Sequence, residues 1–206
     1  MVVDVLVKEK GIMFCADMVK AIVYDKTKTH TRRTSGLEKI NKNPNYWSNP
    51  YCFYNLWVFY NSYTSEVIKC KPRYNVGDIL YLKETYKVSV SPNSVIPVFY
   101  KVDSLVRFLN PSTYEYSSEL SNGDELFKDL KWQSAMFMKR GYARHNRYEV
   151  VSVNPHRIQS ITEAEVLNEG FKTVKDFAET VDRLNKKSKP WDNNSWVWDY
   201  GFKEME

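Results

Sequence analysis

The sequence predicts a mixed α+β fold in a single domain, with short strands forming a small, strongly bent sheet or barrel. The chain has 206 residues, a length typical of one domain, and a hydrophobic share of 43%, enough for a core. Many short apolar runs alternate with polar turns, which indicates strands, and only two or three short stretches have helical spacing. Strands that outnumber short helices in this way favour the α+β class.

The first predicted elements are a strand, a helix and a basic loop. Residues 11–15 are an apolar run after a glycine, which predicts a strand. Asp17 is placed to cap a helix over residues 18–24. Residues 25–33 then hold two lysines, two arginines, a histidine and three threonines with one acid, and we expect a loop.

The next segments predict a loop, a hairpin and a strand. Residues 34–50 are polar and rich in asparagine, so we expect a long loop. Residues 51–63 are rich in aromatic side chains and favour a hairpin. Their rings could stack on bases or form one face of a sheet, and the second interpretation is favoured. Residues 77–78 form a turn that leads into a strand over residues 79–82.

The remaining strands follow from alternating or apolar runs. Residues 89–130 alternate short strands with polar turns, and residues 98–102 are the strongest strand among them. Residues 148–153 predict another strand. In the closing strand, over residues 196–202, even and odd positions should face different sides.

Two helices precede that closing strand. Ser160 or Thr162 can cap the first, which has acids in its first turn, and Gly170 fits its end. Apolar positions within residues 171–184 have helical spacing and predict the second, amphipathic helix.

Composition limits the class of protein. A net charge of +5 and a pI of about 8.9 permit nucleic-acid or nucleotide binding without requiring it. The three cysteines are widely spaced, so we expect free thiols in a reducing compartment. No window approaches 18 uncharged apolar residues, which predicts a cytoplasmic protein without a membrane partner. The histidines lack metal-ligand spacing and the usual cofactor motifs are absent, so no metal or cofactor is expected.

The basic segment suits an anionic ligand that also forms hydrogen bonds. The candidate cations for such a site are Lys26, Lys28, Arg32 and Arg33 of this segment, with Lys83 and Arg144 from later in the chain. A ring from Tyr86 or Trp196 would stack a base beside them.

The same segment offers candidate catalytic groups. Lys28 could act as a base or nucleophile if its surroundings lowered its pKa, and it could activate the hydroxyl of Thr31. Glu169 could then carry the proton to a leaving amine, with Glu84 as the rival acid. A purely structural interpretation is also open, in which Lys28 and Glu169 pair and Thr31 caps a turn.

Four blocks together resemble the ASCH family of the PUA-like superfamily. Residues 12–33 resemble its opening helix and K-T-x-T-R-R signature, and residues 77–86 resemble its G-D-x-L strand. Residues 160–171 resemble its E-G segment, and residues 195–202 resemble its W-V-W closing strand. The blocks occur in family order over nearly the whole chain. Ser195 replaces the family's usual proline.

The resemblance implies a single domain, residues 1–206, with a PUA-like β-barrel, flanking helices, and insertions at about 34–73 and 89–130. The chain is most similar to the long forms of the family found in phages and prophages, which would place the protein in a host cytoplasm. It also implies binding of RNA, a nucleotide or a modified nucleobase. Some small members hydrolyse N4-acetylcytidine with a lysine, a threonine and a glutamate, which fall on Lys28, Thr31 and Glu169.

Four functions follow as hypotheses. The cleft could bind RNA or a modified nucleoside and hydrolyse an N4-acyl cytosine amide. The protein could instead be a non-catalytic RNA-binding module, a metal-independent ribonuclease, or a phage accessory protein whose barrel mediates only protein contacts. The sequence gives no oligomer signal.

Overall fold

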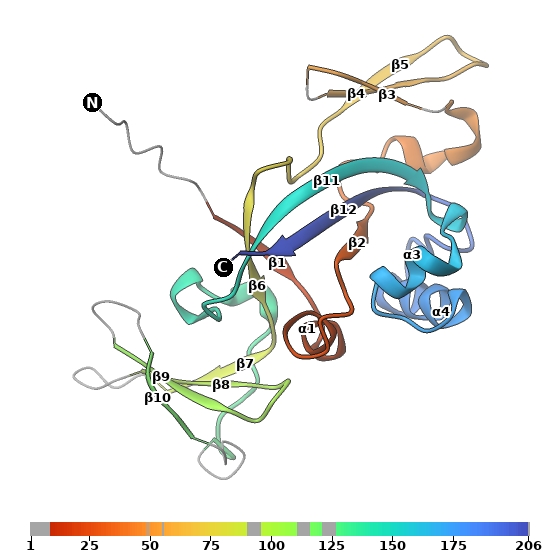
Figure 1. Cartoon of the computed structure of the whole chain (residues 1–206). Helices are drawn as coiled ribbons and strands as arrows, with labels where there is room; N and C mark the ends of the chain where they lie inside the picture. Colours follow the sequence, from red (N-terminus) through yellow and green to blue (C-terminus); the bar gives the residue numbers. More distant parts are fainter. Residues whose placement is uncertain are drawn as a thin grey trace, which may run out of the picture. The chain divides into compact units, whose positions relative to one another are not determined.

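Strands arranged in several sheets make up most of the fold, with few helices among them, so the expected α+β class is confirmed (Figure 1). The structure is a computed structural model that describes residues 9–48, 50–54, 56–89, 96–110, 116–120 and 127–205. The chain forms two compact units. Unit 1 is Met1–Lys26, Ile79–Tyr148 and Met205–Glu206, and unit 2 is Thr27–Asp78 and Glu149–Glu204.

Unit 1 begins with a strand, a helix and a second strand. Strand β1 (Lys10–Met13) pairs in parallel with β6 (Ile79–Lys83), which confirms both predicted strands. Helix α1 (Ala16–Val23) starts two residues earlier than expected. Its N-cap is Cys15, which makes no side-chain cap hydrogen bond. The prediction that Asp17 caps this helix is therefore wrong. Asp17 lies in the first turn, where a carboxylate interacts favourably with the helix dipole.

The other sheet of unit 1 is antiparallel, with the strand order β10-β9-β8-β7. Its strands are β7 (Tyr86–Val88), β8 (Ile96–Tyr100), β9 (Val106–Leu109) and β10 (Tyr116–Leu120). The strand expected at residues 98–102 thus lies two residues earlier. Residues 90–95, 111–115 and 121–126 of the expected insertion lie outside the described residues. Two 3-10 turns follow, η3 (Ala135–Phe137) and η4 (Arg140–Tyr142).

Three strands of unit 2 lie side by side in the order β11-β12-β2. They are β11 (Arg147–Arg157), β12 (Trp196–Glu204) and β2 (His30–Arg33). Figure 1 shows β11 and β12 as long, curved neighbours. Strand β2 is antiparallel to β12. The loop prediction for residues 25–33 is therefore wrong for its last four residues, because pairing with β12 satisfies their backbone groups.

A second, antiparallel sheet of unit 2 has the order β3-β4-β5, with β3 (Tyr51–Phe53), β4 (Leu56–Tyr60) and β5 (Val67–Cys70). The predicted hairpin is confirmed, and β5 extends it. The segment expected as a long loop contains two 3-10 turns, η1 (Ile40–Lys42) and η2 (Pro44–Tyr46). Ile40 is fully buried there, so this part of the segment packs into the core despite the polar composition around it.

The two predicted helices of unit 2 are confirmed. After the 3-10 turn η5 (Ile158–Ser160), α3 (Glu163–Asn168) begins at a capping box in which Thr162 and Glu165 bond reciprocally. Thr162, not Ser160, is thus the cap. Gly170 has a φ of 79°, the left-handed conformation that ends a helix. Helix α4 (Val174–Leu184) is capped by Thr173.

The closing strand β12 separates two kinds of core. Trp196 and Trp198 contact Phe59 of β4 on one face. On the other face, Val197 packs in a cluster with Phe177 of α4. This alternation confirms that even and odd positions face different sides.

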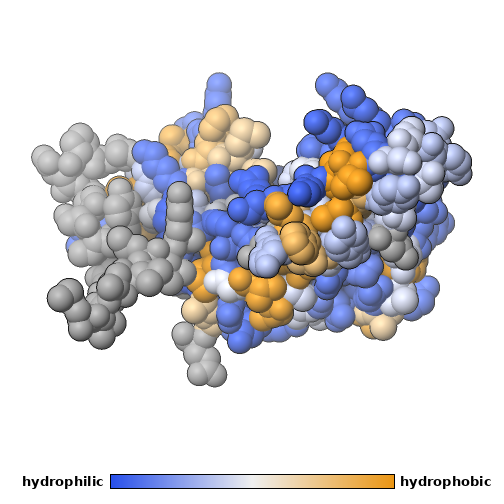
Figure 2. Space-filling model, turned by 90° about the horizontal axis from the view of Figure 1, so that it is seen from above, coloured by the Kyte–Doolittle hydropathy of each residue, from blue (hydrophilic) through white to orange (hydrophobic). Residues whose placement is uncertain are grey.

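The surface carries mixed character. Figure 2 shows hydrophobic residues lying among hydrophilic ones on the face that it draws. Within the described part of the chain, every helix is too short or too polar to cross a membrane.

Candidate functional site

Unit 2 holds a group of charged side chains, buried except for Glu165, beside β2, β12 and α3. We call it the charged cluster, and its members are Lys28, Arg32, Glu165, Glu169 and Asp199. The backbone N–H of Thr29 donates to the carbonyl of Asn168 at 2.8 Å. This bond fixes the segment before β2 against the end of α3, where Glu169 is the C-cap.

Lys28 and Glu169 form the most buried pair of the charged cluster. The Lys28 Nζ donates to Glu169 Oε2 at 2.6 Å, and the two side chains are 0% and 3% exposed. The same Nζ donates to the carbonyl oxygens of Glu169 at 2.9 Å and His30 at 2.8 Å. An ammonium group has three donors, so these three acceptors match its full capacity. The lysine is therefore held in one position.

Arg32 lies among three carboxylates. Its Nη2 donates to Asp199 Oδ2 at 3.1 Å and lies 3.5 Å from Glu165 Oε2. Its Nη1 lies 3.7 Å from Glu169 Oε1, which is too far for a hydrogen bond. Asp199 and Arg32 are direct partners in the register of β12 and β2, so their side chains share one face of the sheet.

Several polar atoms of the charged cluster are buried without a hydrogen-bond partner. They are Nε and Nη1 of Arg32, Oε1 of Glu169 and Oδ1 of Asp199. An unmade hydrogen bond at a buried polar group costs about 1–3 kcal/mol. Such groups in a folded protein call for an explanation, and a bound ligand or water is a common one. The charged cluster thus offers both free donors and free acceptors in a buried position.

His30 lies on the same face of the sheet as Asp199. His30 is the register partner of Gly201, and a side chain at Gly201 would collide with Ser152 and with the His30 ring. Glycine at this position therefore allows the imidazole to approach β12. His30 and His156 both interact electrostatically with Asp199.

The environment raises the pKa of Asp199. Burial is the main cause, because it disfavours the charged form, and the carboxylate of Glu169 adds to it. The positive charge of Arg32 acts in the opposite direction but does not cancel these effects.

We predict that Asp199 makes the protein less stable as the pH rises. Because folding raises the pKa of this acid, the folded protein binds its proton more tightly than the unfolded chain. Its stabilising contribution is full below the usual value of 3.8 and declines as the pH rises towards the folded pKa. Urea unfolding from pH 4 to pH 7 should show the wild type losing stability relative to Asp199→Asn. The exposed Asp129→Asn variant should follow the wild type, and a gap independent of pH would contradict the prediction.

Thr31 lies on a different face of β2. Its register partner is Tyr200, whereas Arg32 pairs with Asp199, and neighbouring residues of a strand point to opposite sides. Thr31 is buried. The structure thus brings Lys28 and Glu169 together and places Thr31 on the opposite face from Arg32. Arg33 shares the Thr31 side by the same alternation.

Trp196, one of the two predicted stacking rings, belongs to the core of unit 2. The centre of its ring lies 5.3 Å from that of Phe59, and its Nε1 donates to the carbonyl of Pro44 at 3.0 Å. The guanidinium of Arg157 lies 5.5 Å from the ring centre. The indole is buried by these contacts.

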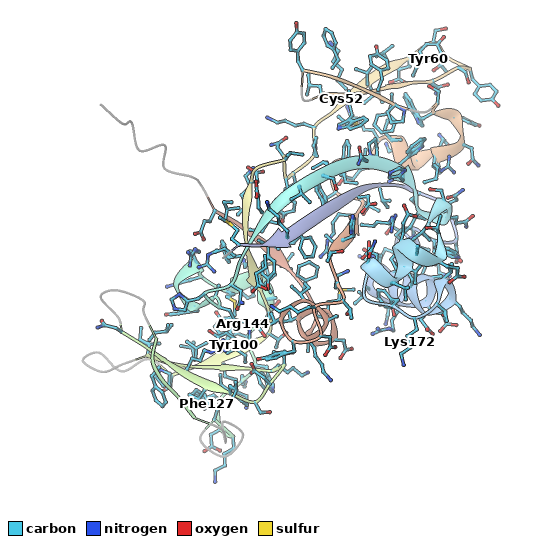
Figure 3. The ribbon with its side chains drawn as sticks, viewed as in Figure 1. Cys52, Tyr60, Tyr100, Phe127, Arg144 and Lys172 are labelled. Carbon is cyan, nitrogen blue, oxygen red and sulfur yellow. The ribbon has the colours of Figure 1, made fainter. Side chains whose placement is uncertain are left out.

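Two further candidates, Arg144 and Glu84, pair in unit 1. The Arg144 Nε lies 2.5 Å from Glu84 Oε1, and its Nη1 lies 2.7 Å from Asp103 Oδ2. The guanidinium also lies 4.4 Å from the ring centre of Tyr100 (Figure 3). Burial acts to lower the pKa of Arg144, but the two carboxylates outweigh it and raise that pKa. Burial raises the pKa of Glu84. Arg144 is fully buried, so its charge serves this network.

The remaining candidates also lie in unit 1. Tyr86 is buried and donates its hydroxyl to the carbonyl of Phe137 at 3.2 Å. Lys83 donates to the carbonyl of Met136 at 2.5 Å. Lys26 is exposed, follows Asp25 in the turn after α1, and has a backbone φ of 54°.

Sequence reasoning missed Asp199 and His30. His30 lies two residues before Arg32 on β2, and the pairing of β2 with β12, which joins segments far apart in the chain, places Asp199 beside Arg32. No protein-family model, curated protein or solved structure matches this chain. Chemically, the charged cluster can accept a proton at a carboxylate, donate one from an ammonium group, and bind a ligand that carries both donors and acceptors.

Proposed function

We propose that the charged cluster of unit 2 binds a nucleobase, either in RNA or in a modified nucleoside or nucleotide. The observation that carries the proposal is the set of buried atoms without hydrogen-bond partners. Arg32 offers donors, and Asp199 offers an acceptor beside it. The edge of a nucleobase presents donors and acceptors side by side, so it complements such a pair.

The resemblance to the ASCH family supports the same assignment. The signature over residues 28–33 includes Lys28 and Arg32, and the E-G segment includes Glu169. Glu169 is distant in sequence from Lys28 and Arg32, yet it meets both of them in the charged cluster. We extend the proposal to the fold, with a PUA-like barrel as its architecture.

We further propose that Lys28 and Glu169 hydrolyse an N4-acyl amide of cytosine. Glu169 would take a proton from water, and the hydroxide would add to the acyl carbon. The C–N bond would then break, and the proton held by Glu169 would pass to N4. One water is consumed, and the products are the free amino group of cytosine and a carboxylic acid. The three N–H groups of Lys28 already have acceptors, so its positive charge would stabilise the negative oxygen of the intermediate electrostatically, without a new hydrogen bond.

In this mechanism the nucleophile that attacks the acyl carbon is water, not the hydroxyl of Thr31. The pleat of β2 supports this choice, because Thr31 points to the side opposite Arg32. A Thr31→Val variant should therefore keep turnover if it folds, whereas a threonine nucleophile would make the same variant inactive.

A non-catalytic RNA-binding module is the second candidate function. It is favoured by the three acceptors around Lys28 Nζ, which hold the ammonium in a purely electrostatic role. Under this alternative, Lys28→Ala would weaken RNA binding and lower its salt slope by about one unit.

The test is an assay of the purified protein with N4-acetylcytidine and other N4-acylated cytosines, following release of cytidine by chromatography. We expect release by the wild type and none by Lys28→Ala, with the exposed Lys172→Ala as the matched control. Binding of cytidine is measured in parallel by calorimetry. Binding without release would favour the non-catalytic module, and neither release nor binding would overturn the nucleobase proposal.

A further inference from the structure

The aromatic residues of the β3-β4-β5 sheet divide between its two faces. Cys52 pairs with Trp57, and the ring centre of Trp57 lies 6.3 Å from that of the buried Trp198. The face that carries Cys52 and Trp57 is therefore directed to the core of unit 2. The register places Tyr51 and Phe53 on the other face. The rings expected on one face of a sheet therefore divide, with Tyr51, Phe53 and Tyr60 on one face and Trp57 and Phe59 on the other.

The outer face, as we call this second face, is exposed around its rim, whereas Val58 at its centre is buried. Its residues, read from the strand register, are Tyr51, Phe53, Leu56, Val58, Tyr60, Val67 and Lys69. Tyr51 is 60% exposed, Phe53 is 55% exposed and Tyr60 is 42% exposed. Figure 3 labels Tyr60 on β4 and Cys52 on β3. Large rings are seldom exposed together in a soluble protein without a binding role.

We propose that the outer face binds single-stranded RNA by stacking bases on Tyr51, Phe53 and Tyr60. Aromatic rings on the face of a small antiparallel sheet are a recurrent platform for unstacked bases. Residues two apart on a strand are about 6.6–6.8 Å apart, which is twice the spacing of stacked bases. Tyr51 and Phe53 could therefore each hold one base of an extended strand.

Charge favours a nucleic acid as the occupant. Among the residues that the register places on the outer face, Lys69 carries the one charge, and it pairs with the central Val58. Lys71 and Arg73 continue the chain just beyond β5, and both are exposed. A phosphate backbone crossing the rings would meet these cations.

The same charge disfavours a second copy of the chain. In a symmetric dimer the same patch contacts itself, so the two Lys69 side chains would lie close together across the interface. Like charges placed together in a buried interface are destabilising. RNA removes this conflict, because it brings the opposite charge.

This site is separate from the charged cluster and does not rest on the function proposed for it. The charged cluster selects one base by hydrogen bonds, whereas stacking is tolerant of sequence. Binding at the outer face should therefore depend weakly on the bases and strongly on the rings.

The experiment measures the affinity of a fluorescein-labelled oligouridylate of about 12 nucleotides by anisotropy. The double variant Tyr51→Ala/Phe53→Ala should bind at least about tenfold more weakly than the wild type. Tyr51→Phe keeps the ring and should retain the wild-type affinity. Phe137→Ala removes an exposed ring of unit 1 and should also bind normally. Lys69→Ala should lower the salt slope by about one unit.

Three results would overturn the inference. The first is an unchanged affinity in the double variant when its circular dichroism and melting curve match the wild type. The second is loss of oligouridylate binding in Lys28→Ala but not in the double variant, which would assign the RNA to the charged cluster. The third is a wild-type dimer in sedimentation that becomes a monomer in the double variant, which would make a second copy the occupant.

Discussion

Replacing Arg144 by methionine should lower the free energy of unfolding by about 3–5 kcal/mol. The guanidinium is fully buried and contacts the carboxylates of Glu84 and Asp103. Removing it would leave two carboxylates in a buried position without their cation, which is far more costly than the net value of an ion pair. The ring of Tyr100 would also lose its cation contact.

Equilibrium urea unfolding followed by tryptophan fluorescence would measure this loss. The matched control is Arg140→Met, because Arg140 pairs with Glu9 at a partly exposed position, where the side chain of Arg140 is 46% exposed. An exposed pair contributes only about 0–1 kcal/mol, so this variant should unfold near the wild type. Equal stability of the two variants would show that the buried network does not stabilise unit 1.

Local signals in the sequence predicted much of the fold. The capping box at Thr162, the glycine stop at Gly170 and the alternation of β12 all arise within a few residues, so their physics is visible in one segment. Aspartate is a preferred N-cap residue, so Asp17 is the start of α1 that propensity predicts, whereas the helix begins after Cys15. Propensity distinguishes such alternatives poorly when the cap makes no side-chain bond.

Non-local pairing accounts for what the sequence could not predict. His30–Arg33 looked like a loop, because nothing in it indicates that β12 supplies its hydrogen bonds. The same pairing places Asp199 beside Arg32, and this carboxylate has no motif of its own. The exposed rings of the outer face were also unpredictable, since alternation gives two faces but not which of them is covered.

Single and double variants of Lys28 and Glu169 should separate the effect of this ion pair on stability from its effect on function. Lys28→Met alone would leave the Glu169 carboxylate buried, with Arg32 Nη1 3.7 Å from its Oε1, so we expect the free energy of unfolding to fall by about 3–5 kcal/mol. The double variant Lys28→Met/Glu169→Leu removes both charges and should recover most of that loss, because an apolar pair of similar size avoids their desolvation. Urea unfolding of the wild type, both single variants and the double variant measures the coupling between the two residues.

Activity should not recover with stability. If the charged cluster hydrolyses an N4-acyl amide, turnover falls by about 10²–10⁴-fold in each single variant and stays low in the stable double variant, because the proton acceptor and the ammonium are both absent. A purely structural ion pair would behave differently, since its effect on ligand binding would disappear once stability returned. A double variant that is stable and binds and turns over its ligand like the wild type would therefore contradict the proposed function and leave Lys28 and Glu169 as a structural pair.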